Sequence, residues 1–403
     1  MNSAVPTRLF RADTLHDIAS AAVVLRNLPA GRDVLAFSMD KSAEATQSLA
    51  NKMRIMARSH AWSEVVDISG LPLAPHIKSG APPRSRLRRL RDITASVSGL
   101  RRMLAPAFGL PPEHPSLRAL LAKKVDELYL TCFHHADVQA LYGIFPSARK
   151  IYTPHGFDSL SLTELTFYSR HCSDFLRSGG RSSVERLKAG LFGDDAVLPR
   201  RMSVDEAYSF NLPMPWARVQ HDLRPHIGRD TMLRFFADLP EAVRDYFEQL
   251  ARRCGENTPL LLLAPYDPDL EPHSERLTRS IVKLAYAMVQ REGASSLLIK
   301  PHPRNSEAQV SSVLERIGHA SPNTALIAVR EHSEFPIEIT LAPFLIRSCG
   351  SFGSSAMRAL KRIYGTTSYC PEQDLIDHYT CLAFSPEDIT TWIEDNKQDY
   401  TAI

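Results

Sequence analysis

The sequence predicts an α/β protein with two doubly wound domains, each built on a parallel sheet. Short apolar strands alternate with helical patterns of about 10–15 residues near both ends of the chain. The run Leu260–Pro265 is apolar almost throughout, which is typical of a central strand buried on both faces. At 403 residues the chain is too long for one ordinary core, and domains of roughly 150–200 residues are the natural expectation.

The first domain, residues 1–255, is expected to begin as β-α-β-α-β. Its predicted elements are the strand Thr7–Arg11, the helix Leu15–Leu28, the strand Asp33–Ser38, the helix Ser42–Arg58 and the strand Ser63–Ile68. Further strands are predicted at Glu127–Thr131 and Arg149–Thr153, with a helix at Ala136–Phe145 between them. Residues 159–253 are expected to be helical and irregular, and to lead into the second domain.

The second domain, residues 256–403, is expected to repeat the alternation. Its predicted strands are Leu260–Pro265, Ser296–Ile299, Thr324–Val329, Pro343–Ile346 and Thr367–Tyr369. Its predicted helices are Glu275–Arg291, Glu307–Ile317, Phe335–Leu341, Ala356–Tyr364 and Pro386–Asn396. The pattern is that of a second doubly wound unit.

Composition argues against several classes of protein. A net charge of +3 gives no overall reason to expect nucleic-acid binding. The six cysteines are scattered without a C-x-x-C pair, so neither a disulfide framework nor a zinc site is expected, and a reducing cytoplasm fits best. Without a signal-peptide pattern or a run of about 18 apolar residues, we expect a soluble or peripheral protein. Asp194 and Asp195 lack a third ligand, so we interpret them as a surface turn.

A strongly basic stretch begins at Arg84–Arg91. Apolar residues recur within it at helical spacing, which predicts a helix that packs one face and keeps its arginines in water. One interpretation is a solvated helix face. The other is an electropositive surface, including Arg88 and Arg89, for an acidic acceptor glycan or anionic lipid headgroups, with about 1 kcal/mol per arginine near such a membrane.

The stretch Lys-Pro-His-Pro at residues 300–303 is the first candidate site. Its two prolines end the apolar strand before it and hold Lys300 and His302 on a stiff, extended segment at the carboxyl edge of the sheet. Open α/β sheets bind ligands at that edge. His302 can donate to a phosphate oxygen or act as a general acid, and Lys300 adds a positive charge nearby. The motif, with Pro303, is predicted to bind the phosphate of an activated sugar donor.

A second polar cluster, Ser-Cys-Gly-Ser-Phe-Gly-Ser-Ser at residues 348–355, is expected to follow an apolar strand and open a helix. Ser351, Ser354 and Ser355 would lie at the helix start, where unpaired N–H groups and the helix dipole favour an anion. Gly350 and Gly353 would let the backbone approach that anion. Serine capping of the helix, without any ligand, is the alternative.

A His-Gly turn at the end of another strand is the candidate for acceptor chemistry. The strand-end position and the permissive Gly156 favour His155 as the general base that takes a proton from an acceptor hydroxyl. Imidazole suits that task because its reference pKa is about 6.5, and Asp158 is the reserve. An ordinary hydrogen-bonded histidine is the alternative. His134 and His135 follow the preceding strand, and we expect them to contact the acceptor at the rim.

The order of these motifs resembles the bacterial sialyltransferases of the GT-B architecture, especially the capsular polysialyltransferase-like group. The resemblance implies two Rossmann-like domains that face a central cleft, the first on the acceptor side and the second binding the nucleotide sugar. It also implies transfer of sialic acid, or a related nonulosonic acid, from its CMP-activated form with inversion and without a metal. His302-Pro303 and Ser354-Ser355 match the motifs that hold the donor phosphate in that family, where the histidine also assists departure of the leaving group.

The third motif departs from that family, which has two acidic residues before a glycine and uses the acid as base. This chain has His155 before Gly156, so the base role of His155 is inferred from position. The same motifs also resemble the teichoic-acid glycerophosphotransferases, in which the histidine before glycine is the base, although the tryptophan before it and the lysine after it are absent here. A third hypothesis is a non-catalytic glycan-binding protein on the same scaffold.

The resemblance implies a role in surface polysaccharide biosynthesis. The expected partners are a nucleotide-sugar donor and an acidic or lipid-linked glycan acceptor, without nucleic acid. No cofactor is expected beyond the CMP-activated sugar, which is a co-substrate. The expected location is the cytoplasm, with peripheral contact at the inner face of the plasma membrane as an alternative.

Overall fold

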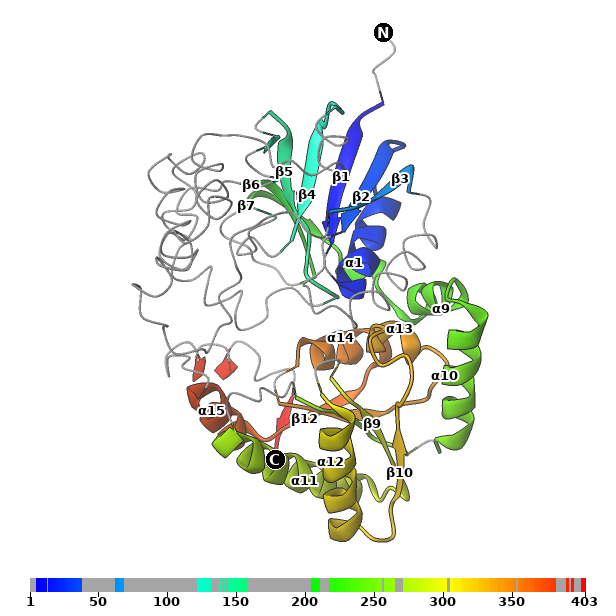
Figure 1. Ribbon diagram of the computed structural model, residues 1–403, viewed down its shortest axis with the longest axis vertical. Coiled ribbons are helices and arrows are strands. Elements are labelled where there is room, and N and C mark those ends of the chain that lie inside the picture. The colour runs from blue at the N-terminus through cyan, green and yellow to red at the C-terminus, as the bar shows by residue number, and fades with distance from the viewer. Residues whose placement is uncertain are drawn as a thin grey trace, which may run out of the picture. The chain divides into compact units, whose positions relative to one another are not determined.

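The chain divides into two compact units, each built on one parallel sheet (Figure 1). The computed structural model describes residues 5–12, 14–37, 62–68, 122–131, 138, 141, 144, 145, 147–157, 204–210, 217–255, 257–264, 271–302, 305–352, 354–381, 389, 390, 393, 394 and 400–403. The first unit comprises Met1–Ser159 and Thr163–Arg224, and the second Leu160–Leu162 and Pro225–Ile403. The predicted fold class of two doubly wound, Rossmann-like α/β domains is confirmed.

The first sheet has the strand order β3-β2-β1-β4-β5-β6-β7, and all neighbouring strands are parallel. Its strands are β1 (Thr7–Ala12), β2 (Arg32–Phe37), β3 (Glu64–Asp67), β4 (Glu127–Leu130), β5 (Arg149–Tyr152), β6 (Val204–Ser209) and β7 (Ala217–Asp222). The chain moves outward from β1 to β3 and then resumes on the other side of β1 with β4. The reversal between β1 and β4 is therefore the topological switch point, where ligands of such sheets bind.

The core of the first unit consists of the central strands and the helix α1 (Leu15–Arg26). Leu9, Leu35 and Leu128 are fully buried on β1, β2 and β4, and Ile18 of α1 is buried as well. Burying an aliphatic side chain of this size contributes about 1.5–3 kcal/mol. The predicted strands of residues 7–153 are all present, with ends shifted by at most two residues.

Strands β6 and β7 correct the expectation that residues 159–253 are helical and irregular. Their sequences, Val-Asp-Glu-Ala-Tyr-Ser and Ala-Arg-Val-Gln-His-Asp, contain no continuous apolar run. On the edge strand β7 the side chain of Val219 is exposed. Polar strands of this kind are stabilised by pairing with a sheet that already exists, so apolar patterning does not find them.

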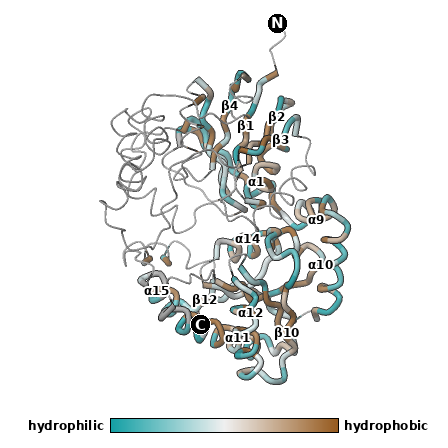
Figure 2. Tube along the Cα trace, viewed as in Figure 1, coloured by the Kyte–Doolittle hydropathy of each residue, from teal (hydrophilic) through white to brown (hydrophobic). Residues whose placement is uncertain are grey.

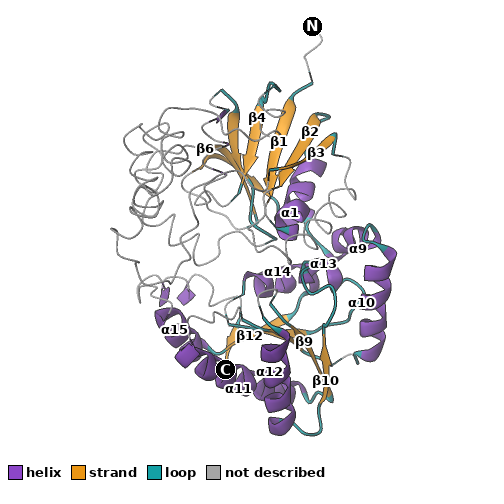
Figure 3. Ribbon diagram, viewed as in Figure 1, coloured by secondary structure: helices purple, strands orange, loops and turns teal. Residues whose placement is uncertain are grey.

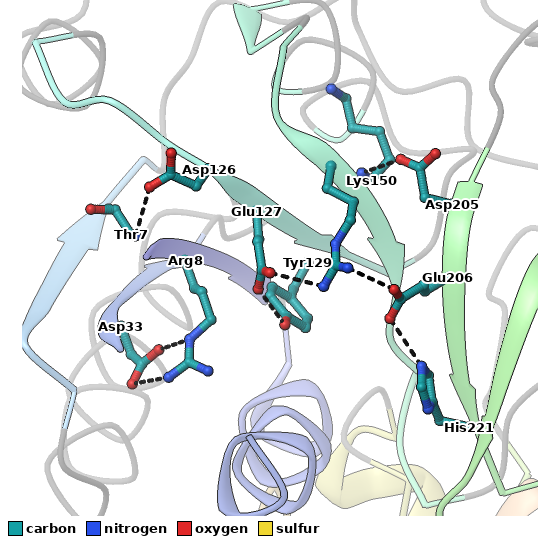
Figure 4. Close-up of polar contacts among 11 residues, drawn as sticks. Thr7, Arg8, Asp33, Asp126, Glu127, Tyr129, Lys150, Asp205, Glu206 and His221 are labelled. Carbon is teal, nitrogen blue, oxygen red and sulfur yellow. Dashed lines mark hydrogen bonds and ion pairs between the residues drawn. The ribbon is translucent and has the colours of Figure 1, made fainter. Parts of the chain in front are cut away.

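A buried ion pair joins β1 to β2 near their amino ends (Figure 4). The Nε atom of Arg8 lies 2.5 Å from Oδ1 of Asp33, and Nη2 of Arg8 lies 3.0 Å from Oδ2. A Cβ atom at Gly31 would lie only 2.3 Å from the Arg8 guanidinium, so the arginine fills the space that this glycine leaves. Removing one member of such a buried pair commonly costs about 3–5 kcal/mol.

A second row of charges crosses the same sheet (Figure 4). Arg149 on β5 pairs with Glu127 on β4 and with Glu206 on β6, both at 2.8 Å. Glu206 also lies 2.9 Å from Nε2 of His221 on β7. Because Glu127 and Arg149 are the first residues of their strands, the row starts at the edge opposite to the ligand-binding edge, and we assign it to strand pairing.

The second sheet has the order β10-β9-β8-β11-β12-β13 and is also parallel throughout. Its strands are β8 (Leu260–Leu262), β9 (Ser296–Lys300), β10 (Ala325–Ala328), β11 (Ser348–Gly350), β12 (Thr367–Cys370) and β13 (Thr401–Ala402). The chain again moves outward from its first strand and resumes on the other side. The switch point lies between β8 and β11.

Helices cover both faces of the second sheet (Figure 3). The helices α11 (Glu271–Glu292), α12 (Glu307–Ala320) and α15 (Glu372–Cys381) lie on one side, and α9 (Arg229–Ala237), α13 (Ile337–Thr340) and α14 (Ser355–Tyr364) on the other. The helix α10 (Glu241–Arg253) follows α9 and is markedly polar along its length, in contrast to the apolar β10 (Figure 2). None of the helices in the described part of the chain is long and apolar enough to cross a membrane.

One predicted strand of the second unit differs from the structure. The predicted strand Pro343–Ile346 is absent, because a turn at residues 341–343 precedes irregular chain and pairing begins only at Ser348 in β11. There Cys349 is fully buried and pairs with Leu260 of β8. The short strand β13 and the helix α15 are additions to the predicted elements. The compact units divide at Arg224, so α9 and α10 fall in the second unit, and the predicted division into domains after residue 255 stays a prediction.

Candidate active site

In the first unit, His155 lies at the carboxyl edge of the sheet, three residues beyond the end of β5. Its Nδ1 atom lies 2.7 Å from Oδ1 of Asp17, which belongs to the first turn of α1. The Asp17 side chain is 1% exposed and that of His155 is 33% exposed. The histidine thus has one edge against a buried carboxylate and part of its surface open to solvent.

Local sequence fixes the position of Asp17. Thr14 caps α1, and its side-chain oxygen accepts the Asp17 N–H at 3.1 Å. In return, Oδ2 of Asp17 accepts the Thr14 N–H at 3.0 Å. This reciprocal arrangement is a capping box, which satisfies two backbone donors at a helix start. One carboxylate oxygen therefore serves the helix and the other faces His155.

Gly156 allows the turn that brings His155 to α1. Its φ angle is +83°, which lies in the left-handed region that glycine adopts without steric cost. A Cβ atom at this position would lie 3.6 Å from Cβ of His16, which precedes Asp17 on α1. The glycine was predicted to permit a tight turn, and the structure contains that turn.

In the second unit, His302 lies two residues beyond the end of β9. The side chain of Asn305 holds its backbone, because Oδ1 accepts the His302 N–H at 2.7 Å and Nδ2 donates to the Ala264 carbonyl at 3.2 Å. The Asn305 N–H also donates to the His302 carbonyl at 2.9 Å. One amide therefore links the loop after β9 to the end of β8, beside the switch point.

Lys300, the last residue of β9, is only 7% exposed. Its Nζ atom donates to the Ser333 carbonyl at 2.5 Å, which ties β9 to the loop after β10. Burial lowers the pKa of Lys300 to about 8, and the charges of Glu338 and Glu334 act in the opposite direction. This contact is structural, and the predicted role of Lys300 at the donor phosphate stays a prediction.

The loop after β10 is held at a second point. The hydroxyl of Tyr246 on α10 accepts the N–H groups of Arg330 and Glu331 at 2.8 and 3.0 Å. His332 has a φ angle of 58°, which is uncommon for a residue other than glycine, and its ring lies edge to face against Tyr246. Anchors on two elements thus fix this segment of the carboxyl edge.

The serine cluster divides between a strand end and a helix start. Ser351 directly follows β11, is buried, and donates its N–H to the Tyr369 carbonyl at 3.1 Å, so it belongs to the strand end and not to the predicted helix start. Ser354 is the N-cap of α14, and its Oγ accepts the Ala356 N–H at 3.3 Å. Ser355 is the first residue of α14. Ser354 thus caps α14, as the alternative interpretation of this cluster predicted. Phosphate binding by these serines stays a prediction.

Close packing accounts for the glycine at position 350. A Cβ atom there would lie 2.2 Å from Sδ of Met288 on α11 and 3.3 Å from Cδ1 of Leu284. The absent side chain lets α11 approach β11 closely, so packing accounts for a glycine at this position even without a ligand.

The topology of the second sheet brings the two predicted phosphate motifs to one edge. His302 follows β9 and Ser354 follows β11, and both strands are neighbours of β8. Two strand spacings amount to about 9–10 Å. The motifs therefore flank the switch point, on either side of one central strand.

Several predicted site residues lie outside the described part of the chain: Asp158, Pro303, Gly353, His134, His135, Arg88 and Arg89, together with the side chain of Ser355. Their predicted roles stay predictions. Within the described residues, no three histidine, cysteine or acidic side chains gather as a metal-binding group.

The prediction from sequence missed three residues that hold the site, namely Asp17, Asn305 and Tyr246. Thr14-x-x-Asp17 resembles a capping-box pattern and could have located the helix start. Asn305, three residues after His302, could have indicated a side chain that closes a turn. Nothing in the sequence connects Tyr246 to the loop after β10.

Residues 246–370 match the alpha-2,8-polysialyltransferase (POLYST) family. This segment runs from α10 to the end of β12 and includes both His302 and Ser354. The match confirms the predicted resemblance over these residues, and the prediction of a glycosyltransferase with it. No curated protein sequence matches the chain.

Solved structures similar to the chain include the following three, all at TM-scores below 0.5. TcCGT1 in complex with UDP has a TM-score of 0.45 and 10% identity, over 98% of this chain and 92% of that chain. The N-terminal domain of Candida albicans trehalose-6-phosphate phosphatase has a TM-score of 0.41 and 7% identity, over 98% and 93%. Acinetobacter baumannii MurG has a TM-score of 0.38 and 10% identity, over 98% and 92%.

Proposed function

We propose that this glycosyltransferase moves sialic acid, or a related nonulosonic acid, from a CMP-activated donor to a glycan hydroxyl in surface polysaccharide synthesis, with inversion and without a metal. The observation that carries the proposal is the polysialyltransferase match over residues 246–370, the part of the second unit in which His302 and Ser354 flank the switch point. A phosphate bound there would face both motifs at once.

On the donor side, the proposed role of His302 is to donate to the phosphate of the nucleotide. As the bond from the anomeric carbon to the phosphate oxygen breaks, its electron pair moves to that oxygen, and a nearby donor stabilises the charge. The start of α14 supports the same phosphate through its N–H groups and the positive end of the helix dipole. The ten residues of α14 form nearly three turns, so this helix is long enough to have such a dipole, and the Ala356 N–H of its first turn already donates to Oγ of Ser354.

On the acceptor side, the proposed base is His155. The acceptor oxygen attacks the anomeric carbon on the face opposite to the leaving phosphate, and its proton passes to the imidazole. The released nucleotide is CMP. A histidine suits this step because its proton affinity lies near neutral pH.

The proposed acceptor is an acidic or lipid-linked glycan, and no cofactor is needed beyond the activated sugar. This part of the proposal rests on the basic stretch at Arg84–Arg91, which includes Arg88 and Arg89. A cytoplasmic location, with contact at the inner face of the plasma membrane, would follow from such an acceptor.

A nucleotide screen tests the donor assignment. A ligand that binds only the native state raises the melting temperature, by the equivalent of about 2.7 kcal/mol at 100 times its Kd. We expect CMP to raise the melting temperature more than UDP or GDP at equal concentration. Release of CMP from CMP-sialic acid, with an α2,8-linked sialic acid oligomer as acceptor and with EDTA present, then tests transfer and metal independence together.

A second candidate is glycerophosphotransfer from CDP-glycerol, because a histidine before glycine serves as base in that chemistry. The contact between His155 and Asp17 is compatible with either reaction. Turnover of CDP-glycerol without turnover of CMP-sialic acid would replace the proposed function with this one.

A further inference from the structure

We propose that Asp17 is a positioning residue that holds His155 in the orientation and tautomer of a general base. The inference rests on the proposed base role of His155. Asp17 lies on α1, 138 positions before His155 in the sequence. The two side chains meet because α1 begins at the same edge of the sheet at which β5 ends.

The contact is short and is made by a carboxylate that cannot move freely. Oδ1 of Asp17 lies 2.7 Å from Nδ1 of His155, while Oδ2 accepts the Thr14 N–H at 3.0 Å. The Asp17 side chain is 1% exposed. With one oxygen fixed to the helix start and the whole group buried, the carboxylate presents its other oxygen to the imidazole in one geometry.

Electrostatics determine which partner donates. Asp17 lies in the first turn of α1, where the positive end of the helix dipole and the Thr14 N–H favour its negative charge. A carboxylate can only accept, so the proton of this contact belongs to Nδ1 of His155. The basic lone pair of the ring is then on Nε2, the nitrogen farther from Asp17.

That arrangement is what a base needs when it receives a proton. As the acceptor hydroxyl loses its proton to Nε2, the ring becomes an imidazolium with an N–H on both nitrogens. Asp17 remains ionised and stabilises the new positive charge. No other proton moves in this step, and the proton leaves His155 after the product departs.

The simpler interpretation is that Asp17 only caps α1. Capping accounts for Oδ2, through its bond to the Thr14 N–H. It does not account for Oδ1, which faces the ring of a histidine that follows a different strand. The two interpretations predict different behaviour of variants, because capping is independent of His155.

A double-mutant cycle separates them. Transfer from CMP-sialic acid to an α2,8-linked sialic acid oligomer is measured for the full chain and for Asp17→Asn, His155→Ala and the double variant. We expect kcat to fall about 100-fold in His155→Ala, and at least 10-fold in Asp17→Asn. The KM for the donor should be unchanged in both. The double variant should be no slower than His155→Ala.

Thr14→Ala is the matched control. It removes the other half of the capping box but leaves both carboxylate oxygens of Asp17 in place, so it should lower the melting temperature and reduce kcat much less than Asp17→Asn does. An Asp17→Asn effect that is equally large with and without His155 would overturn the inference. So would a Thr14→Ala variant that is as slow as Asp17→Asn.

A second measurement requires neither a stable Asp17 variant nor an active enzyme. The tautomer of His155 is observed by ¹⁵N NMR on histidine-labelled protein, with the signals assigned by their loss in His155→Ala. We expect protonation at Nδ1. Protonation at Nε2 alone would overturn the inference, even if CMP-sialic acid is the donor. Protonation at Nδ1 in a protein that turns over neither donor would leave the positioning intact and refute the proposed function.

Discussion

The two units present their histidines in different ways. In the first unit a buried carboxylate contacts the ring of His155 directly. In the second unit a neutral amide, that of Asn305, binds the backbone of His302 and links it to the Ala264 carbonyl. Both histidines lie just beyond the carboxyl end of a parallel strand, but one is fixed through its side chain by a charge and the other through its main chain.

The difference matches the two proposed tasks. A base that gains a proton becomes positive, and a buried negative partner stabilises that state. A group that donates to a phosphate already faces a negative charge, and a carboxylate beside it would repel the ligand. The residue that supports each histidine, and not the histidine alone, therefore distinguishes the two proposed roles.

The largest expected effect in the second unit is that of His302→Ala. Loss of the proposed phosphate donor should lower the rate of CMP release from CMP-sialic acid about 10³-fold, the order found when one such donor is removed. His319→Ala, on the exposed end of α12, is the control and should be neutral. Normal CMP release by His302→Ala would show that His302 does not stabilise the leaving phosphate, and the proposed separate roles of the two histidines would be wrong.

The next largest effect concerns the buried charge of Lys300. Its pKa is lowered from 10.5 to about 8 by burial, so the unfolded chain holds the proton more tightly than the folded protein does. Burial of the charged lysine therefore destabilises the folded protein by its full amount below pH 8, by a decreasing amount between pH 8 and 10.5, and not at all above pH 10.5. The shift corresponds to about 3 kcal/mol.

Lys300→Met removes this dependence. We expect the free energy of unfolding of the wild type, relative to that of Lys300→Met, to rise as the pH increases from 7 to 10. Urea unfolding at several pH values measures it. A difference independent of pH would mean that Lys300 keeps its ordinary affinity for the proton, as it would if it faced a phosphate site in solvent.

A smaller effect on stability is expected for Gly350→Ala. The added methyl group would meet Met288, which is fully buried, and overpacking of this kind costs about 1–3 kcal/mol. Gly255→Ala is the control, because its nearest contact would be at 3.9 Å. If Gly350→Ala keeps its stability but loses affinity for CMP, the glycine serves the ligand and not the packing of α11.

The smallest effect is expected for Asn305→Asp, which tests the comparison most directly. The variant keeps an oxygen to accept the His302 N–H but places a carboxylate beside the proposed phosphate site. We expect the Kd for CMP to rise about 10-fold, or about 1.4 kcal/mol. Asn323→Asp, at an exposed turn, is the control. Unchanged affinity for CMP would show that charge beside His302 is immaterial.

The sequence predicted the strands that have apolar runs and failed where other forces decide. Leu260–Leu262 and Ser296–Lys300 are buried throughout, and their patterns are plain in the chain. The polar strands β6 and β7 have no such pattern and depend on pairing with a sheet built from distant residues. At β11 the apolar residues before Ser348 have the pattern of a strand, but pairing begins only at Ser348, and Cys349 and Gly350 pair with Leu260 and Leu261 of β8.

For the site, the sequence indicated the two histidines but not their supports. A strand end followed by proline or glycine is a local signal, so His155 and His302 could be found. The partner of His155 is 138 positions away in the sequence, and no pattern in one chain connects the two. The support of His302 is local, but asparagine is common in loops of every kind, so its position alone does not identify the residue that closes this turn.

Each sheet has its own reversal of strand order, between β1 and β4 in the first unit and between β8 and β11 in the second. Among the described strands neither sheet takes one from the other, so the strands of each edge come from one half of the chain. Exchange of either half between related enzymes would therefore leave the other edge intact. Under the proposed function, the preferences for acceptor and donor can then diverge separately, one unit changing while the other keeps its sequence.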